Sequence, residues 1–141
     1  MNDAEFEAQR ARVQALVDRW LPRLGLKWWV RIEVVFVRDQ AQMGNEHADA
    51  HCHASWEYRA ATLTFSLPKC ADLDDEMLES IVVHELCHVL TAGFDSLIPD
   101  DKQESPIIEH TVTSLAQAFL WVRDFAANGE MSLQGEQGRA A

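Results

Sequence analysis

Residues 84–88 read His-Glu-Leu-Cys-His, and this short segment constrains the fold and the chemistry of the chain more than any other. Residues four apart on an α-helix lie on one face, so a helix here points His84 and His88 in the same direction. Two imidazoles in that arrangement can bind one Zn²⁺, and Glu85 is close enough to act on a water molecule beside the metal. The segment therefore predicts a metal site on a helix, with Glu85 as the general base.

The residues around this segment are apolar on nearly every side of the predicted helix, which is typical of a helix buried in a core. They are Met77, Leu78, Ile81, Val82, Val83, Leu86, Val89 and Leu90. Burying histidines and a carboxylate without partners costs about 1–3 kcal/mol for each unsatisfied group. A bound metal removes that cost, whereas a chance match to the motif requires ordinary core partners for both histidines. The helical context favours the metal.

Length and composition indicate one domain, predicted over residues 1–128. The chain has 141 residues, 48% of them hydrophobic, which is enough for a core of its own. A net charge of −11 argues against nucleic acid and against anionic membrane surfaces as partners. The N-terminus is acidic and lacks the pattern of a secretion signal, and Cys52, Cys70 and Cys87 form no paired framework. We therefore expect a cytoplasmic protein without a membrane span.

The first half of the chain predicts one helix and three strands. In residues 3–21 apolar side chains recur at steps of three and four, and Pro22 and Gly25 mark the end of that helix. Apolar residues then alternate with polar ones over three stretches, 28–37, 48–57 and 60–67. Charges on one face of the first stretch predict a partly solvated sheet of antiparallel or mixed type. This order of elements indicates an α+β fold.

Two more helices are expected in the second half. The helix with the motif should run from about 74 to 91, with acidic residues at its start, where they favour the helix dipole, and Gly93 at its end. A last helix should run from about 105 to 127, begun by a serine cap and a proline. Residues 129–141 show no period and are predicted to form a flexible tail.

A catalytic zinc needs a third protein ligand and an open position. In one common arrangement a third histidine follows the second by six residues, with a glycine midway, but here those positions hold Phe94 and Thr91. Asp95 is one residue out of register for the aspartate form of that pattern. The last helix offers Glu109 and His110 side by side, so the third ligand is expected there.

Helical periodicity of about 100° per residue separates these two candidates. Glu109 falls on the apolar side of the helix, level with Ala116 and Leu120, whereas His110 falls on the far side. The alternative reason for a glutamate at this place is that an acid in the first turn favours the helix dipole. A carboxylate turned toward the core fits a metal ligand, so Glu109 is predicted to be the third one.

The chain resembles the gluzincin-type zinc metallopeptidases, whose third ligand is a downstream glutamate. Two segments carry the resemblance: His84-Glu85-Leu86-Cys87-His88, and the run that begins with Glu109. More narrowly, residues 28–122 look like the minimal zincins of phage and prophage genomes, with some similarity to the ImmA/IrrE-type peptidases. Val112 departs from the alanine that those peptidases often have three residues after the ligand glutamate.

The resemblance implies a zinc-dependent enzyme that hydrolyses peptide bonds in a protein or peptide substrate. One Zn²⁺ per chain would be held by His84, His88 and Glu109, and Glu85 would act as general base and then as general acid. The implied architecture is a minimal zincin-like one. It has an N-terminal helix, a mixed sheet of about three strands, a buried motif helix and a C-terminal helix.

Several residues keep more than one interpretation at this stage. Tyr58, Arg59 and His110 are all candidates to stabilise an oxyanion beside the metal. His51 and His53 share one face of a predicted strand, where they form either a second metal site or part of a solvated edge. His110 is the weakest of the three oxyanion candidates because its predicted direction is away from the core, and a solvated edge is the more usual place for two histidines at this spacing.

The mode of action is also open in two respects. The substrate backbone is expected to pair with an edge strand, for which residues 60–67 are the candidate. A catalytically weak, zinc-stabilised protein-binding module is the alternative function, although an intact Glu85 argues against it. The sequence indicates neither a particular substrate nor an oligomeric state.

Overall fold

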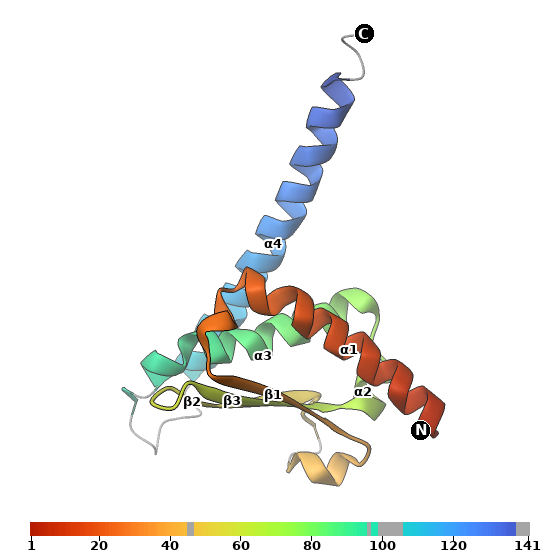
Figure 1. Cartoon of the computed structure of the whole chain (residues 1–141), viewed down its shortest axis with the longest axis vertical. Coiled ribbons are helices and arrows are strands. Elements are labelled where there is room, and N and C mark those ends of the chain that lie inside the picture. Colours follow the sequence, from red (N-terminus) through yellow and green to blue (C-terminus); the bar gives the residue numbers. More distant parts are fainter. Residues whose placement is uncertain (45–46, 96, 99–105, 138–141) are drawn as a thin grey trace.

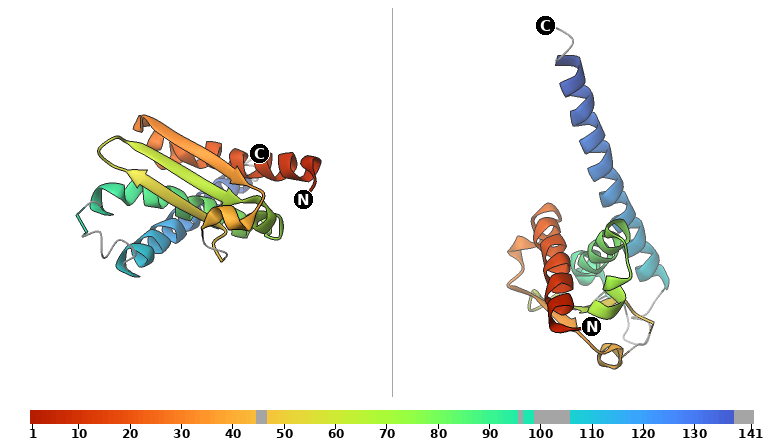
Figure 2. Two further views of the ribbon diagram at one scale, coloured as in Figure 1. Left: turned by 90° about the horizontal axis from the view of Figure 1, so that it is seen from below. Right: turned by 90° about the vertical axis from the view of Figure 1, so that its right-hand side faces the viewer.

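Three long helices lie on one side of a small sheet (Figure 1). The computed structural model describes residues 1–44, 47–95, 97–98 and 106–137, with 129–137 given by backbone alone. The helices are α1 (Asp3–Arg23), α3 (Asp75–Asp95) and α4 (Pro106–Gln137). In the two views of Figure 2, α3 lies between the other two, with α1 on the β1 side and α4 on the β2 side of the sheet. The expected α+β fold with helices at both ends is confirmed.

The sheet is mixed and has the strand order β1-β3-β2. Its strands are β1 (Arg31–Val37), β2 (Ala50–Ser55) and β3 (Ala60–Ser66). β3 pairs in parallel with β1 and antiparallel with β2, so both of its sides are occupied. The prediction that residues 60–67 form an edge strand is therefore wrong, and β2 is the edge strand beside α3. Alternating apolar residues show which face of a strand is buried but not which strands it pairs with.

The first strand starts three residues later than its sequence pattern predicts. Gly25 takes a left-handed conformation with φ of 68°, and the chain then forms a 3₁₀ turn, η1 (Leu26–Trp28), that buries Leu26. Within β1, alternate residues pack on the core, and on the other face Arg31 and Glu33 are exposed while Val35 is half-buried and Val37 is buried. The predicted solvated face of the sheet is confirmed. A second 3₁₀ turn, η2 (Gln40–Met43), lies in the connection between β1 and β2.

Helix α1 begins with a capping box. The Asn2 side chain accepts a hydrogen bond from the Glu5 backbone N–H, and the Glu5 side chain accepts one from the Asn2 backbone N–H. Its buried residues, Val13, Val17 and Trp20, join the core that α3 also forms. The helix ends at Arg23, two residues beyond its predicted end. A short helix, α2 (Leu67–Ala71), follows β3 and contacts α1.

Helix α3 is the centre of the core. It is capped by Asp74, whose Oδ1 accepts a hydrogen bond 2.8 Å long from the Met77 backbone N–H. Its length and hydropathy alone would suit a membrane span, but more than half of it is buried inside the protein. It runs to Asp95, four residues past its predicted end, so Gly93 lies inside the helix. The Trp56 ring would come within 3.3 Å of a Cβ at Gly93, which makes close approach the reason for that glycine.

Helix α4 begins at Pro106 as predicted, while the expected cap, Ser105, lies outside the described residues. The first half of the helix packs on the core through three buried residues, Ile108, Val112 and Ala116. The helix was expected to end near Ala127, yet its backbone continues to Gln137 and projects away from the body of the protein (Figure 1). Residues 138–141 lie outside the described residues. The predicted domain boundary at 128 and the flexibility of the tail stay predictions.

Candidate metal centre

Three potential ligand residues from two helices come together in the structure. The Nε2 atoms of His84 and His88 on α3 lie 3.2 Å apart. From α4, Glu109 brings Oε2 to 3.5 Å from the His84 Nε2 and Oε1 to 3.4 Å from the His88 Nε2. Within the described ranges, no other set of three or more His, Cys, Asp or Glu residues comes close enough to hold a metal ion. The group could hold one.

These separations fit tetrahedral coordination. Ligands bound at about 2.0–2.1 Å on the corners of a tetrahedron lie about 3.3–3.4 Å from one another. The two Nε2 atoms, 3.2 Å apart, and the Glu109 oxygens nearest to them, Oε2 at 3.5 Å from His84 and Oε1 at 3.4 Å from His88, have separations close to that value. Both imidazoles and the Glu109 carboxylate, each offering one ligand atom within 4.8 Å of the others, therefore surround a position that a metal ion could take.

The sequence brings about this convergence in two ways. The spacing of four residues on α3 puts His84 and His88 one turn apart on the same face. On α4, the buried residues Ile108 and Val112 hold the first turns against α3, which turns Glu109 toward the histidines. The choice of Glu109 over His110, made from helical periodicity, agrees with this geometry.

The site is open on the side of Glu109. The two histidine side chains are mostly buried, but the Glu109 side chain keeps 57% of its surface exposed. Solvent therefore reaches the carboxylate from outside the protein. A structural metal site is closed by protein ligands, whereas a catalytic one keeps a position for water or substrate. The exposure of Glu109 makes the group accessible to solvent on that side.

Glu85 is a buried carboxyl group next to this cluster. Its residue is only 6% exposed, and its Oε2 atom has no hydrogen-bond partner among the described residues. Burial, reinforced by the negative charge of Glu109, raises the pKa of Glu85 to about 8. An unpartnered carboxyl costs about 1–3 kcal/mol, so its presence indicates a function rather than a packing role.

The surroundings of His88 favour the form of imidazole that a metal requires. Burial lowers the pKa of His88, and the neighbouring His84 lowers it further, although the Glu109 charge acts in the opposite direction. A lowered pKa keeps the imidazole neutral at neutral pH. Neutral imidazole is the form that binds a metal ion, so the local electrostatics fit the proposed ligand.

Two cysteines lie near the cluster and differ in their surroundings. Cys87 is fully buried, and burial raises its thiol pKa to about 12, so it serves as a small core residue. Cys52, on the inner face of β2, has its pKa raised by burial and then by the charges of Glu85 and Asp95. Strand alternation puts Cys52 on the face opposite His51 and His53, but it does not predict the closeness of Cys52 to Glu85. That closeness depends on β2 lying over α3.

The other candidate residues are not part of the described cluster. Tyr58 is 77% exposed in the turn after β2, and His110 is exposed on α4. Arg59 lies over the Trp28 ring, 5.6 Å from its centroid. Their suggested oxyanion role stays a prediction.

His51 and His53 are exposed on the outer face of β2. They belong to no metal-binding group among the described residues, where the cluster on α3 and α4 is the one that qualifies. Their position matches the solvated-edge interpretation.

Comparison with known proteins gives no match to a protein-family model, to a curated protein or to a solved structure.

Proposed function

We propose that this chain is a zinc-dependent metallopeptidase of the gluzincin type, and within it of the minimal kind found in phage and prophage genomes. His84, His88 and Glu109 would hold one Zn²⁺, and Glu85 would serve as general base and acid. One observation carries the proposal: an unpartnered, buried Glu85 oxygen lies next to the group of His84, His88 and Glu109, whose ligand atoms come within 4.8 Å of one another. Charge-neutral imidazoles with one carboxylate are a donor set that suits zinc.

The bound ion would supply a Lewis acid that polarises a substrate carbonyl and lowers the pKa of a water molecule to about 7. Glu85 would take the proton of the attacking water and pass it to the leaving amine. A carboxyl group suits both steps when its pKa is near the working pH, and burial moves Glu85 in that direction. The half-exposed Glu109 leaves one side of the site open to a peptide.

The sheet has two edge strands, β1 and β2, and β2 is the one that packs on the motif helix α3. Its outer edge, which pairs with no described strand, is therefore the docking edge that we propose for the substrate backbone. The Ser66 N–H donates to the Asp49 carbonyl, so these two residues form a hydrogen-bonded pair. Because hydrogen-bonded and non-hydrogen-bonded pairs alternate, this contact identifies the hydrogen-bonded pairs along β2 and β3. By the alternation of antiparallel ladders, the backbone N–H and C=O groups of Cys52 and Ala54 point away from β3. They are available to a peptide added as a further strand.

The test is hydrolysis by the purified, zinc-loaded chain of a fluorogenic peptide library, with and without a chelator. Glu85→Gln should retain zinc and the fold but lose about 10²–10⁴-fold in rate, the usual contribution of a general base. Glu33→Gln, on the exposed face of β1, is the matched control and should behave as wild type. Zinc binding without hydrolysis by any peptide would instead favour the zinc-stabilised protein-binding module.

A further inference from the structure

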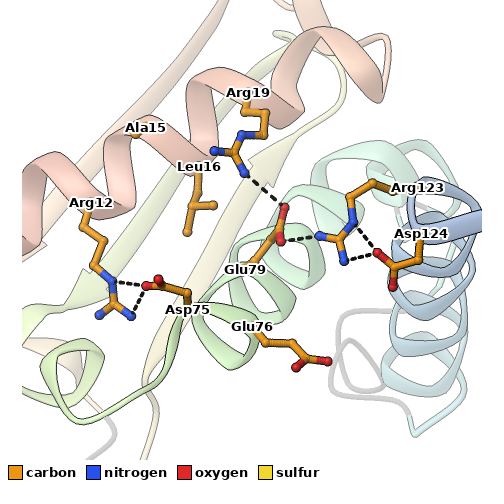
Figure 3. Close-up of a pocket in the computed structure, with 9 residues that line it drawn as sticks. All are labelled: Arg12, Ala15, Leu16, Arg19, Asp75, Glu76, Glu79, Arg123 and Asp124. Carbon is orange, nitrogen blue, oxygen red and sulfur yellow. Dashed lines mark hydrogen bonds and ion pairs between the residues drawn. The ribbon is translucent and has the colours of Figure 1, made fainter. Parts of the chain in front are cut away.

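A single buried carboxylate, Glu79, joins the three helices in the first half of α3, five residues before His84 (Figure 3). Glu79 Oε1 accepts a hydrogen bond of 2.7 Å from the Trp20 indole N–H and lies 3.6 Å from the Arg19 guanidinium, both on α1. Its Oε2 accepts a hydrogen bond from Arg123 of α4. Arg123 also contacts Asp124. Both carboxylate oxygens of Glu79 therefore have partners, and two of these partners are charged arginines.

These contacts border a groove of about 640 Å³ between α1, α3 and α4. Arg12 lines the same groove but connects different elements. It pairs with Asp75 at 2.7 Å and donates to the Leu73 carbonyl at 2.9 Å, so it ties α1 to the start of α3. None of its described hydrogen bonds or ion pairs goes to α4. The two arginines therefore offer a natural comparison.

Contacts between α3 and α4 run in opposite order along the two helices. Glu109 meets the histidines at 84 and 88, Gln117 Nε2 lies 3.4 Å from Ser80 Oγ, and Arg123 meets Glu79. The helices are therefore antiparallel, and Arg123 lies about 21 Å along α4 from Glu109. Side chains 124–128 of α4 are exposed. Arg123 is consequently the last described side chain of α4 that is not exposed.

The contacts between these two ends are mainly apolar. Val112 and Ala116 pack into the core, and such packing is not directional. A charged hydrogen bond to a fixed carboxylate is directional, so it defines how far α4 can slide or turn relative to α3. Ligand constellations work only when held within about 0.5 Å of their productive geometry. If α4 is held at a fixed position on α3, Glu109 is held within that tolerance, although its own carboxylate is half exposed.

We infer that Arg123 and Glu79 are positioning residues for the metal centre, which fix the register of α4 on α3 and so hold Glu109 in place as a ligand. This inference rests on the proposed function, since it needs a metal bound by His84, His88 and Glu109. It assigns the ion pair a role beyond stability. The pair is predicted to act on the affinity and geometry of the metal site rather than on the chemical step.

The test uses Co²⁺ with the full-length chain, because its visible absorption reports the ligand set. Arg123→Met removes the charge and keeps an apolar stem, Arg123→Lys is the conservative variant, and Arg12→Met is the matched control. Arg123→Met should weaken Co²⁺ binding at least tenfold and shift the spectrum toward that of Glu109→Ala. Arg123→Lys should recover most of the affinity. Arg12→Met should bind Co²⁺ within about twofold of wild type even where urea unfolding of the metal-free chain shows it destabilised.

Two results would overturn the inference while leaving the proposed function intact. One is a wild-type affinity and spectrum in Arg123→Met, and the other is an equal loss of affinity in Arg12→Met, which would indicate general loosening. A wild-type chain that binds no Co²⁺ would overturn both proposals. Should Arg123→Met fail to fold, Glu79→Gln, which still accepts from Trp20, replaces it with the same expected loss and the same spectral readout.

Discussion

Glu109 Oε1 on α4 lies 3.4 Å from His88 Nε2 on α3. The two residues are separated in the sequence by the end of one helix and the start of the next, so the contact exists only in the folded chain. A metal bound at this point would cross-link the two helices. Binding of the ion and stability of the α3–α4 pair should therefore depend on each other.

Glu109→Ala and His110→Ala should have opposite outcomes although the residues are neighbours. Removing Glu109 takes one of three ligands from the site, so zinc binding should weaken severely and activity should end. Removing His110, exposed on the same helix, should leave zinc in place with at most a moderate rate effect. Metal analysis of the two dialysed variants measures the difference. Retention of zinc by Glu109→Ala and its loss from His110→Ala would reverse the ligand assignment.

Chelation should destabilise the wild-type chain. A ligand that binds only the folded state at a free concentration 100 times its dissociation constant adds about 2.7 kcal/mol to the free energy of unfolding. Thermal unfolding with and without a chelator should therefore show a lower midpoint for the metal-free protein. His84→Ala should be insensitive to the chelator, while His53→Ala, on the outer face of β2, should respond as wild type does. An unchanged wild-type midpoint would mean that no metal links the helices.

Ala54→Pro should block substrate docking without disturbing the metal. The Ala54 N–H points to the free edge of β2, so proline there removes a donor for the substrate and spares the ladder with β3. Peptide hydrolysis should fall mainly through a higher KM, with zinc content unchanged. Ala54→Gly keeps the N–H and serves as the control. Equal kinetics in the two variants would place the substrate elsewhere.

Acid should weaken the contact between the three helices at Glu79. Burial by itself raises the pKa of this group, but hydrogen bonds from Trp20 and Arg123 and the charges of Arg123 and Arg19 outweigh it, so the pKa lies below its usual value. A folded-state pKa below the unfolded one stabilises the protein above the unfolded pKa, and that stabilisation is lost as the pH falls toward the folded pKa.

Urea unfolding of the metal-free chain between pH 6 and pH 3 measures this effect. The free energy of unfolding of wild type should fall more steeply with acid than that of Glu79→Gln, which cannot titrate at this position. At pH 6 the variant should be less stable by about 1.5–3 kcal/mol, the usual range for hydrogen bonds to charged groups. Parallel pH profiles for the two proteins would show that Glu79 is not the responsible group.

The sequence by itself determined the features that depend on a single helix or strand. The spacing of His84 and His88, the apolar surroundings of their helix and the orientation of Glu109 all follow from a period of 3.6 residues, which one stretch of chain contains in full. For the same reason the strands at 50–55 and 60–66 agree with their alternating patterns. Predicted helix ends were less accurate, because the glycine at 93 suits the Trp56 ring packed on it rather than a helix stop.

Only the tertiary structure decided which elements meet. Strand β3 became the central strand and β2 the edge because the backbone hydrogen bonds of a sheet join residues far apart in sequence, and alternation is the same for either order. The convergence of Trp20, Arg19 and Arg123 on Glu79 is likewise absent from any local pattern, since each is an ordinary residue of its own helix. Periodicity tells which way a side chain points, but its partner depends on how the helices pack.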